Sequence, residues 1–263
     1  MIGAIYGDIA GSVYEFHNIR TKDFELLTDD CYFTDDSVCT IAFMDWLLHS
    51  PIRDAKTATQ YLHSWCRRYP RRGYGGNFYR WIYSDNPQPY GSYGNGAAMR
   101  ISSVAYAAKD LDELKILSDT VTGITHGHEE GLKGALTVAT CIFMALHGSS
   151  KEQIRKYAIS QYPEIANFDY EELRKKYGFY EICQMSVPQA IYCFLISEDF
   201  EDCAKTTISI GGDCDTTAAM SCAIAEAFYG TKNEHFEQIK RFLLKEMIDV
   251  IEEFSTSYPF NEK

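Results

Sequence analysis

Helical periodicity of the apolar residues runs through most of this sequence. Five apolar residues after the stretch FTDD recur at the i, i+3, i+4, i+7, i+8 spacing of a buried helix face: Cys39, Ala42, Phe43, Trp46 and Leu47. After GNG, smaller side chains repeat in the same way: Ala97, Ala98, Ile101, Val104, Ala105 and Ala108. No segment shows the convincing alternation of a strand. The sequence therefore predicts an all-α fold, a compact multi-helix bundle that carries its function on the connecting loops.

Four further helices are predicted from their patterns and end signals. One spans residues 128–148 and ends at Gly148, and an amphipathic helix spans residues 234–254. Ser150 with Gln153 has the spacing of a capping box, and so has Ser186 with Gln189, where Pro188 suits a first helical turn. The chain has no linker, repeat or low-complexity tract, so we expect one domain over residues 1–263.

Composition excludes some function classes. A formal net charge of -12 opposes non-specific binding to nucleic acid and to an anionic membrane surface. An anionic ligand would need local cations or backbone N–H groups. The nine cysteines form no C-x-x-C pair, which favours reduced thiols in a cytoplasmic protein. The first residues have no basic region typical of a signal peptide, and no apolar run approaches a membrane span, so we expect a soluble, cytoplasmic protein.

Two acidic stretches each precede a helix of apolar residues. FTDDSV contains Thr34, Asp35, Asp36 and Ser37, and GGDCDTTAA contains Asp213, Asp215, Thr216 and Thr217. Each stretch taken alone suits a helix cap, because Thr, Ser and Asp are preferred at that position and carboxylates favour the positive end of the helix dipole. The alternative is a cation site that both stretches share.

The energies favour the cation site if the two stretches converge. A cap with its dipole contribution stabilises by roughly 1–2 kcal/mol. Two carboxylates about 4 Å apart repel by roughly 4 kcal/mol at an effective dielectric constant near 20. Four converging carboxylates would therefore need a cation between them. Oxygen ligands of this kind suit Mg²⁺, Ca²⁺ or Mn²⁺ rather than zinc.

Other chemistry is mostly absent from the sequence. It has no phosphate-binding P-loop, no H-E-x-x-H and no G-x-S-x-G. GNGAAM puts flexible backbone before a predicted helix, where phosphate binds readily, although an ordinary turn with Ala-rich packing explains it equally well. THGHEEG offers His126 and His128 with Glu129 and Glu130 as metal ligands, but spacing i, i+2 turns the two rings apart. A single histidine that hydrogen-bonds a ligand is the better interpretation.

Five stretches in this order resemble the ADP-ribosylglycohydrolase family, which includes the dinitrogenase reductase-activating glycohydrolases: GAIYGDIAGSVYEF, FTDDSV, GSYGNGAAMR, TH and GGDCDTTAA. They cover nearly the whole chain, and within the family they are most similar to the branch of ADP-ribosylserine and poly(ADP-ribose) hydrolases. The resemblance implies an all-helical fold with two Mg²⁺ ions, sometimes Mn²⁺, at the base of a cleft for ADP-ribose. It also implies a monomer.

The resemblance implies a role for particular residues. The matched metal ligands are Thr34, Asp35, Asp36, Asp213, Asp215 and Thr216. Glu15 matches a mobile acidic residue over the reacting ribose, and His126 matches a contact to the diphosphate. The loop that wraps the diphosphate and ribose matches Gly91, Ser92, Tyr93, Gly94, Asn95 and Gly96, and a second glycine loop near the distal ribose matches Gly73 and Gly75. Ser37 stands where the family more often has Thr, and the loop over residues 17–33 is short.

The resemblance implies hydrolysis of the bond at C1″ of ADP-ribose attached to a protein side chain or other acceptor, with Glu15, Asp35 and Asp215 as catalytic carboxylates. Two alternatives remain open at this point: a module that binds ADP-ribose without cleaving it, and a metal-dependent phosphohydrolase that cleaves the diphosphate. No motif identifies the leaving group, so arginine, serine or another acceptor fits equally.

Overall fold

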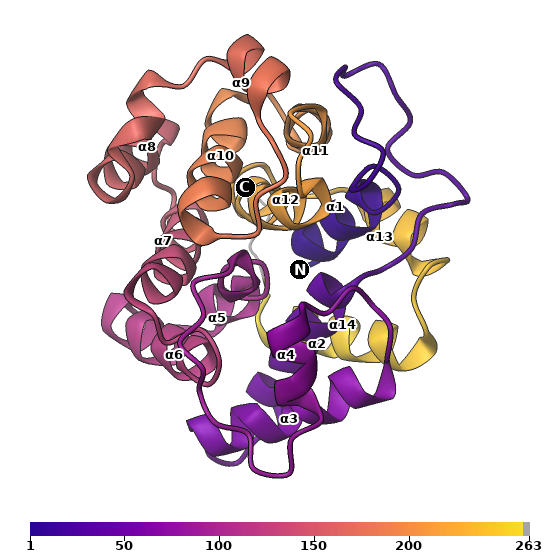
Figure 1. Ribbon diagram of the computed structural model, residues 1–263, viewed down its shortest axis with the longest axis vertical. Helices are drawn as coiled ribbons and strands as arrows, with labels where there is room; N and C mark the ends of the chain where they lie inside the picture. Colours follow the sequence, from indigo (N-terminus) through magenta and orange to yellow (C-terminus); the bar gives the residue numbers. More distant parts are fainter. Residues whose placement is uncertain (260–263) are drawn as a thin grey trace.

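The computed structural model describes residues 1–259, whose regular structure consists of fourteen α-helices and two 3₁₀ helices (Figure 1). The prediction of an all-α fold is confirmed, because these residues contain no strand and only one isolated bridge, between Gly94 and Ile182. The helices are α1 (Gly3–Gly11), α2 (Asp35–His49), α3 (Ala55–Arg68), α4 (Gly76–Ile82), η1 (Asn95–Ala97), α5 (Ser102–Ala107), α6 (Leu111–Gly123), α7 (Glu129–Leu146), α8 (Lys151–Gln161), η2 (Pro163–Asn167), α9 (Tyr170–Lys176), α10 (Cys183–Ile196), α11 (Phe200–Ser209), α12 (Cys214–Tyr229), α13 (Asn233–Lys240) and α14 (Lys245–Ser257).

The helices α1 and α12 pack along each other at the centre of the molecule (Figure 1). Glycines at every fourth position of α1 face α12: a Cβ on Gly3 would lie 2.4 Å from the Cys222 carbonyl oxygen, and one on Gly7 would lie 2.2 Å from that of Ala218. On Gly11 the Cβ would lie 2.4 Å from the Cα of Asp215. Because residues four apart share one helix face, these glycines let the two backbones touch.

The predicted helix after FTDD is α2, and it is buried along most of its length. It packs against α3, α14, α1 and α5. The two acidic stretches therefore stand at the N-terminal ends of two buried helices, α2 and α12, and both of these helices pack on α1.

Two of the other predictions are confirmed and one is wrong. The helix predicted over residues 128–148 is α7, and the capping box of Ser150 and Gln153 is present at the start of α8. Ser186 does not begin a helix, because α10 already starts at Cys183, and Pro188 lies inside it. The start is moved back by the loop before it, where the Cys183 N–H donates to the Tyr93 carbonyl at 3.0 Å.

Two predicted helices are broken by the structure. The helix expected after GNG is the short η1, a turn, and then α5, since the Asn95 carbonyl accepts from the N–H groups of both Ala98 and Met99 as the chain turns. The helix expected over residues 234–254 is divided into α13 and α14. The chain turns at Arg241, between the two helices. The Arg241 guanidinium donates to the Leu27 carbonyl at 3.1 Å, which binds this turn to the loop around Leu27.

All nine cysteines are free and buried, as predicted for reduced thiols. Within the described residues, none of the helices combines the length and the apolar composition needed to cross a membrane.

Candidate active site

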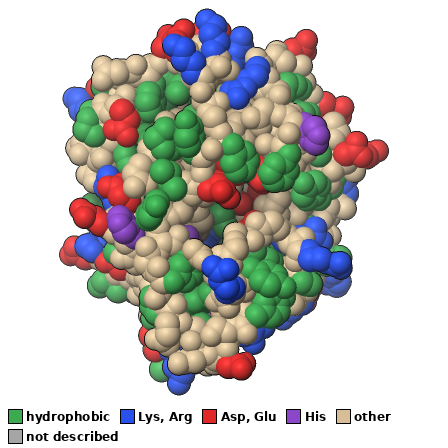
Figure 2. Space-filling view, in the orientation of Figure 1, with side chains coloured by type: hydrophobic (Ala, Val, Ile, Leu, Met, Phe, Trp, Pro, Cys, Tyr) green, Lys and Arg blue, Asp and Glu red, His purple; other side chains and the backbone are tan. Residues whose placement is uncertain are grey.

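A cleft of about 600 Å³ opens where five loops meet the N-terminal ends of α2 and α12. Figure 2 shows it as a hollow near the centre of one face, with acidic side chains inside it and hydrophobic side chains around its rim. Its size is that of an ordinary small-molecule site. The loops belong to residues 15–16, 71–78, 90–100, 126 and 179–181, so the site is assembled from the whole length of the chain.

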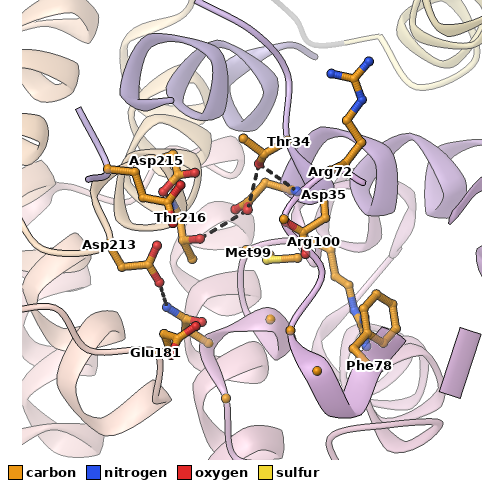
Figure 3. Close-up of a pocket in the computed structure, with 18 of the residues that line it drawn as sticks. Thr34, Asp35, Arg72, Phe78, Met99, Arg100, Glu181, Asp213, Asp215 and Thr216 are labelled. Atoms are coloured by element: carbon orange, nitrogen blue, oxygen red, sulfur yellow. Dashed lines mark hydrogen bonds between the residues drawn. The ribbon is translucent and has the colours of Figure 1, made fainter. Parts of the chain in front are cut away.

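The two acidic stretches converge at the base of this cleft, as the hypothesis of a shared cation site requires (Figure 3). The Thr216 hydroxyl donates to the Asp36 carboxylate at 3.2 Å and so joins α12 directly to α2. Thr34 does act as a cap, accepting from the Asp36 N–H at 3.3 Å. Capping therefore accounts for one side chain at the start of α2 and leaves the carboxylates unexplained.

Capping also fails to explain Asp213. This residue occupies the N-cap position of α12, yet its side chain accepts no hydrogen bond from the helix backbone. Its carboxylate instead accepts from the Asn95 side-chain amide at 2.6 Å (Figure 3). The start of α12 thus directs a carboxylate into the cleft and gives up the usual cap.

The carboxylates at the base repel one another. Burial, with nearby carboxylates adding to it, raises the pKa of Asp36 and of Asp215 well above the ordinary value. Burial likewise raises the pKa of Asp35 and Asp213. One oxygen of Asp36, Oδ1, is buried and has no hydrogen-bond partner among the described residues. A buried, unpartnered carboxylate oxygen amid like charges fits a cation as its missing partner.

The geometry offers two overlapping groups of carboxylates. Oxygens of Glu15, Asp213 and Asp215 lie within 4.8 Å of one another, and so do oxygens of Asp8, Asp36 and Asp215. Asp215 belongs to both groups. Asp35 belongs to neither, and its Oδ1 lies beside Gly73.

Asp8 is a site residue that the sequence interpretation missed. Its two oxygens accept from the Thr34 N–H at 3.0 Å, the Thr34 hydroxyl at 2.6 Å, the Ser37 N–H at 3.0 Å and the Ser37 hydroxyl. With its oxygens accepting from these four donors, Asp8 anchors the start of α2. The signal was available as a lone carboxylate in the glycine-rich stretch GAIYGDIAG. Ser37 stands where the family more often has Thr, and its hydroxyl donates to the Asp8 carboxylate.

Glu15 lies at the mouth of the cleft, directly after α1. Burial and the nearby charge of Asp213 raise its pKa to about 7. The exposed rings of Phe16 and Phe179 stack beside it with centroids 5.9 Å apart. Asn18 fixes this loop to the start of α12, since its side-chain amide donates to the Glu15 carbonyl and to the Gly212 carbonyl.

The two glycine loops flank the cleft. Gly73 has φ of 95°, which only glycine adopts readily, and a Cβ there would lie 3.1 Å from Asp35 Oδ1. Gly75, Ser92, Gly94, Asn95 and Gly96 also line the cleft. Gly91 and Tyr93 are not among the lining residues, although both stand in the matched loop. The Tyr93 ring turns outward and contacts His128, with centroids 5.1 Å apart.

The two histidines have separate surroundings, as the i, i+2 spacing indicated. His126 is buried and lines the cleft, whereas Nδ1 of His128 caps α7 by accepting from the Glu130 N–H at 3.1 Å. The structure therefore provides one histidine to the cleft and no site of two imidazoles.

Three arginines on the cleft were also missed: Arg71, Arg72 and Arg100. Arg71 and Arg72 are not buried and can supply the local cations that an anionic ligand requires in a chain of net charge -12, whereas Arg100 is buried. The run YPRRGYGG was a visible signal for the first two, and Arg71 adopts a φ of 64°, a strained value for a side chain of this kind.

Comparison with known proteins identifies the family of this chain. The sequence model of the ADP-ribosylglycohydrolase family matches residues 1–254. This all-α protein with a carboxylate-lined cleft is therefore a glycohydrolase. The chain belongs to the ADP-ribosylglycohydrolase family.

Relatives cover most of the chain. It is 28% identical to the mouse "ADP-ribosylhydrolase ARH3", over 88% of this chain and 82% of that protein. It is 27% identical to the Rhodospirillum rubrum "ADP-ribosyl-[dinitrogen reductase] glycohydrolase", over 55% of this chain and 49% of that protein. A solved "ADP-ribosylglycohydrolase-related protein complex" shares the fold, with a TM-score of 0.71, 20% identity and coverage of 97% and 95% of the two chains.

Proposed function

We propose that this enzyme hydrolyses the glycosidic bond at C1″ of ADP-ribose attached to a protein side chain or other acceptor, and releases ADP-ribose in a Mg²⁺-dependent reaction. The observation that carries the proposal is the buried, unpartnered Asp36 oxygen within converging carboxylates at the base of a glycine-lined cleft. The names of the relatives, an ADP-ribosylhydrolase and an ADP-ribosyl glycohydrolase, support the choice of bond.

The proposed metal ligands come from the two acidic stretches. They are Thr34, Asp35, Asp36, Asp213, Asp215 and Thr216, and Asp215 belongs to both of the carboxylate groups at the base of the cleft. When bound, two Mg²⁺ or Mn²⁺ ions would hold ribose hydroxyls, orient a water and lower its pKa. Asp8 holds Thr34 in place for this task through its hydrogen bonds.

Proton transfer is assigned to carboxylates at the mouth and base. Glu15, with a pKa raised to about 7, can both release and accept a proton near neutral pH. Its oxygens lie within 4.8 Å of those of Asp213 and Asp215, so a reacting group held at the base is within its reach. Asp215 and Asp35 are the other carboxylates proposed to act on the reacting ribose or its water.

The remaining lining residues are proposed to bind the nucleotide. Ser92, Gly94, Asn95, Gly96 and His126 would hold the diphosphate and adjoining ribose, and Gly73 and Gly75 the distal ribose. For Gly91 and Tyr93 we propose a supporting role in the same loop, because the Tyr93 carbonyl fixes the loop to the start of α10.

A turnover panel tests the proposal. Arginine-, serine- and base-linked ADP-ribose are incubated with the protein, with Mg²⁺ or with a chelator, and the products are separated by chromatography. Release of free ADP-ribose that requires Mg²⁺ is the expected result, and the panel also identifies the acceptor. Release of AMP would instead indicate a phosphohydrolase, and tight binding without product would indicate a binding module.

Variants sharpen the same experiment. Glu15→Gln should lower kcat by about 10²–10⁴-fold, the usual size of a proton-transfer contribution, while leaving the Mg²⁺-induced rise in Tm intact. Glu25→Gln, an exposed glutamate on the same loop, is the matched control and should turn over normally. Unchanged turnover in Glu15→Gln would remove Glu15 from the mechanism.

A further inference from the structure

Arg100 is a buried cation without a countercharge. Only 1% of its surface is exposed, and none of the ion pairs among the described residues includes it. Two of its nitrogens, Nε and Nη1, have no hydrogen-bond partner in residues 1–259. Its guanidinium carbon lies 5.5 Å from the centre of the Phe43 ring and 5.3 Å from that of Phe78. Figure 3 shows the Arg100 side chain beside Phe78. Burying an unpaired charge is costly, so a use for it is expected.

The strongest polar contact of Arg100 leads to Thr125. Nη2 donates to the Thr125 hydroxyl at 2.5 Å, and the same hydroxyl lies 2.8 Å from Nδ1 of His126. A guanidinium has donors only, so the hydroxyl must accept from Arg100, and its own proton is then free to donate to the histidine. Nη2 also lies 3.4 Å from Nδ1.

The contacts around Nδ1 favour one state of the His126 ring. Arg100 can only donate, and the Thr125 hydroxyl has a proton to donate, so Nδ1 is best placed as an acceptor, in a neutral ring with its proton on Nε2. The pKa of His126 agrees, because burial and the charge of Arg100 both lower it well below the ordinary value.

Nε2 of His126 faces the glycine loop of the cleft. A Cβ on Gly96 would lie 3.2 Å from Nε2, and one on Gly94 would lie 3.5 Å from it. The absence of these side chains leaves room beside a nitrogen for which the described residues provide no partner. An N–H donor in that room suits an anionic oxygen.

We propose that Arg100 is a positioning residue that acts through Thr125 to hold His126 as an Nε2–H donor for the diphosphate of the ligand. This inference rests on the proposed function for the identity of the ligand, but the state of the ring can be measured without any ligand. Arg100 borders the cleft, but only 1% of its surface is exposed, so we assign it a role through Thr125 and no direct contact with the ligand.

The first experiment reads the ring state in the ligand-free protein. Long-range ¹H–¹⁵N correlation spectra of the imidazole should show the Nε2–H form for His126 in the wild-type protein. Thr125→Val removes the hydroxyl at nearly constant volume and should give a mixture of tautomers, whereas Thr125→Ser should restore the single form. Thr122→Val is the matched control, because Thr122 is equally buried and its hydroxyl has no partner in the described residues.

The second experiment measures binding of ADP and of adenosine by calorimetry. Thr125→Val should raise the Kd for ADP about tenfold, as expected for losing a hydrogen bond to a charged group, and leave the Kd for adenosine unchanged. Arg100→Met should act in the same direction, and Thr125→Ser and Thr122→Val should bind like the wild-type protein. A general structural defect would weaken both ligands together.

The outcomes separate the two levels of the claim. An unchanged tautomer in Thr125→Val overturns the proposal, and so does a changed tautomer with unchanged binding of ADP. If the wild-type protein binds neither ADP nor ADP-ribose, the proposed function fails and this role fails with it, even if the tautomer responds to Thr125.

Discussion

At the residue scale, Asp36 is a carboxylate in an environment that disfavours its charged form, because it is buried among other carboxylates. One oxygen accepts from the Thr216 hydroxyl and lies 3.4 Å from the Thr34 hydroxyl, and the other is buried without a partner in the described residues. Asp8 and Asp35 add like charge and contribute to its raised pKa. The metal-free protein therefore bears a local cost that a bound cation would remove.

Replacing Asp36 by Asn tests this cost. Asp36→Asn keeps an acceptor for the two hydroxyls and removes one charge, so the metal-free protein should become more stable by about 1–2 kcal/mol. The same change should abolish the rise in Tm that Mg²⁺ produces in the wild-type protein. Thermal unfolding with chelator and with Mg²⁺ measures both effects. Asp30→Asn, an exposed aspartate, should change neither.

The pH dependence of stability follows from the same carboxylates. Their folded pKa values are raised, so the folded state keeps protons that the unfolded chain loses near pH 4. The contribution of these groups to the free energy of unfolding is therefore fully present below that pH. It is lost as pH rises through their folded pKa values, and the folded pKa of Glu15 is about 7.

We expect the free energy of unfolding of the metal-free protein to fall between pH 5 and pH 8, by up to about 1.4 kcal/mol per pH unit for each such group. The Tm should fall with it. Mg²⁺ should flatten the dependence, since a cation replaces the protons. Asp36→Asn should reduce the slope and Asp30→Asn should keep it. A metal-free protein that grows more stable over this range would contradict the assigned direction of these pKa shifts.

At the scale of elements, the close contact of α1 and α12 sets the geometry of the site. Gly11 meets the backbone of Asp215, and three residues earlier Asp8 holds Thr34 and Ser37 of the next helix. The α1 helix thus links the two acidic stretches by bringing α2 and α12 to the same place. Its glycines are needed for proximity and not for a special backbone conformation.

Gly11→Ala should separate the two helices. The added methyl would lie 2.4 Å from the Cα of Asp215, an overlap with backbone that costs about 1–3 kcal/mol. We expect a lower Tm together with weaker binding of Mg²⁺, measured by titration calorimetry. Gly123→Ala, at the end of α6, meets nothing within 4 Å and is the matched control. Loss of stability with unaltered Mg²⁺ affinity would separate the helix contact from the metal site.

At the scale of the whole molecule, the first residues of the chain are bound to two helices that come late in the sequence, α12 and α14. Glu226 of α12 accepts from the backbone N–H groups of Ile2 and Gly3 at 2.8 Å each and so caps α1. The N-terminal amine of Met1 donates to the Ser255 hydroxyl of α14 at 2.9 Å. The candidate site takes residues from position 8 to position 216. The contacts of Met1, Ile2 and Gly3 with α12 and α14 fix α1, which contributes Asp8 to the site.

We therefore expect residues 1–263 to unfold in one cooperative transition, which is also the test of the one-domain prediction. Scanning calorimetry should give a single peak whose van't Hoff and calorimetric enthalpies agree, and Mg²⁺ should move the whole peak. Two separable peaks, only one of which responds to Mg²⁺, would contradict it.

The sequence by itself determined the class of fold and identified the carboxylates that the structure brings together in the candidate site. Spacing of 3.6 residues identified α2 and α7, because burial of one helix face leaves a local periodic pattern. The paired acidic stretches suggested a cation site for a similar reason, since an excess of carboxylates over what a cap needs is visible in a few residues. Local patterns were sufficient for both.

Only the tertiary structure decided how those parts meet. The break between α13 and α14 and the early start of α10 depend on contacts with distant loops, at Leu27 and Tyr93, which no local pattern encodes. Asp8 and Arg100 were missed for the same reason: each looks like an isolated charge in an apolar stretch until its partners, Thr34 for one and Thr125 for the other, are brought beside it. Tyr93 was placed in the matched loop, but its side chain turns outward to His128 because the direction of a loop side chain follows from packing and not from its position in the sequence.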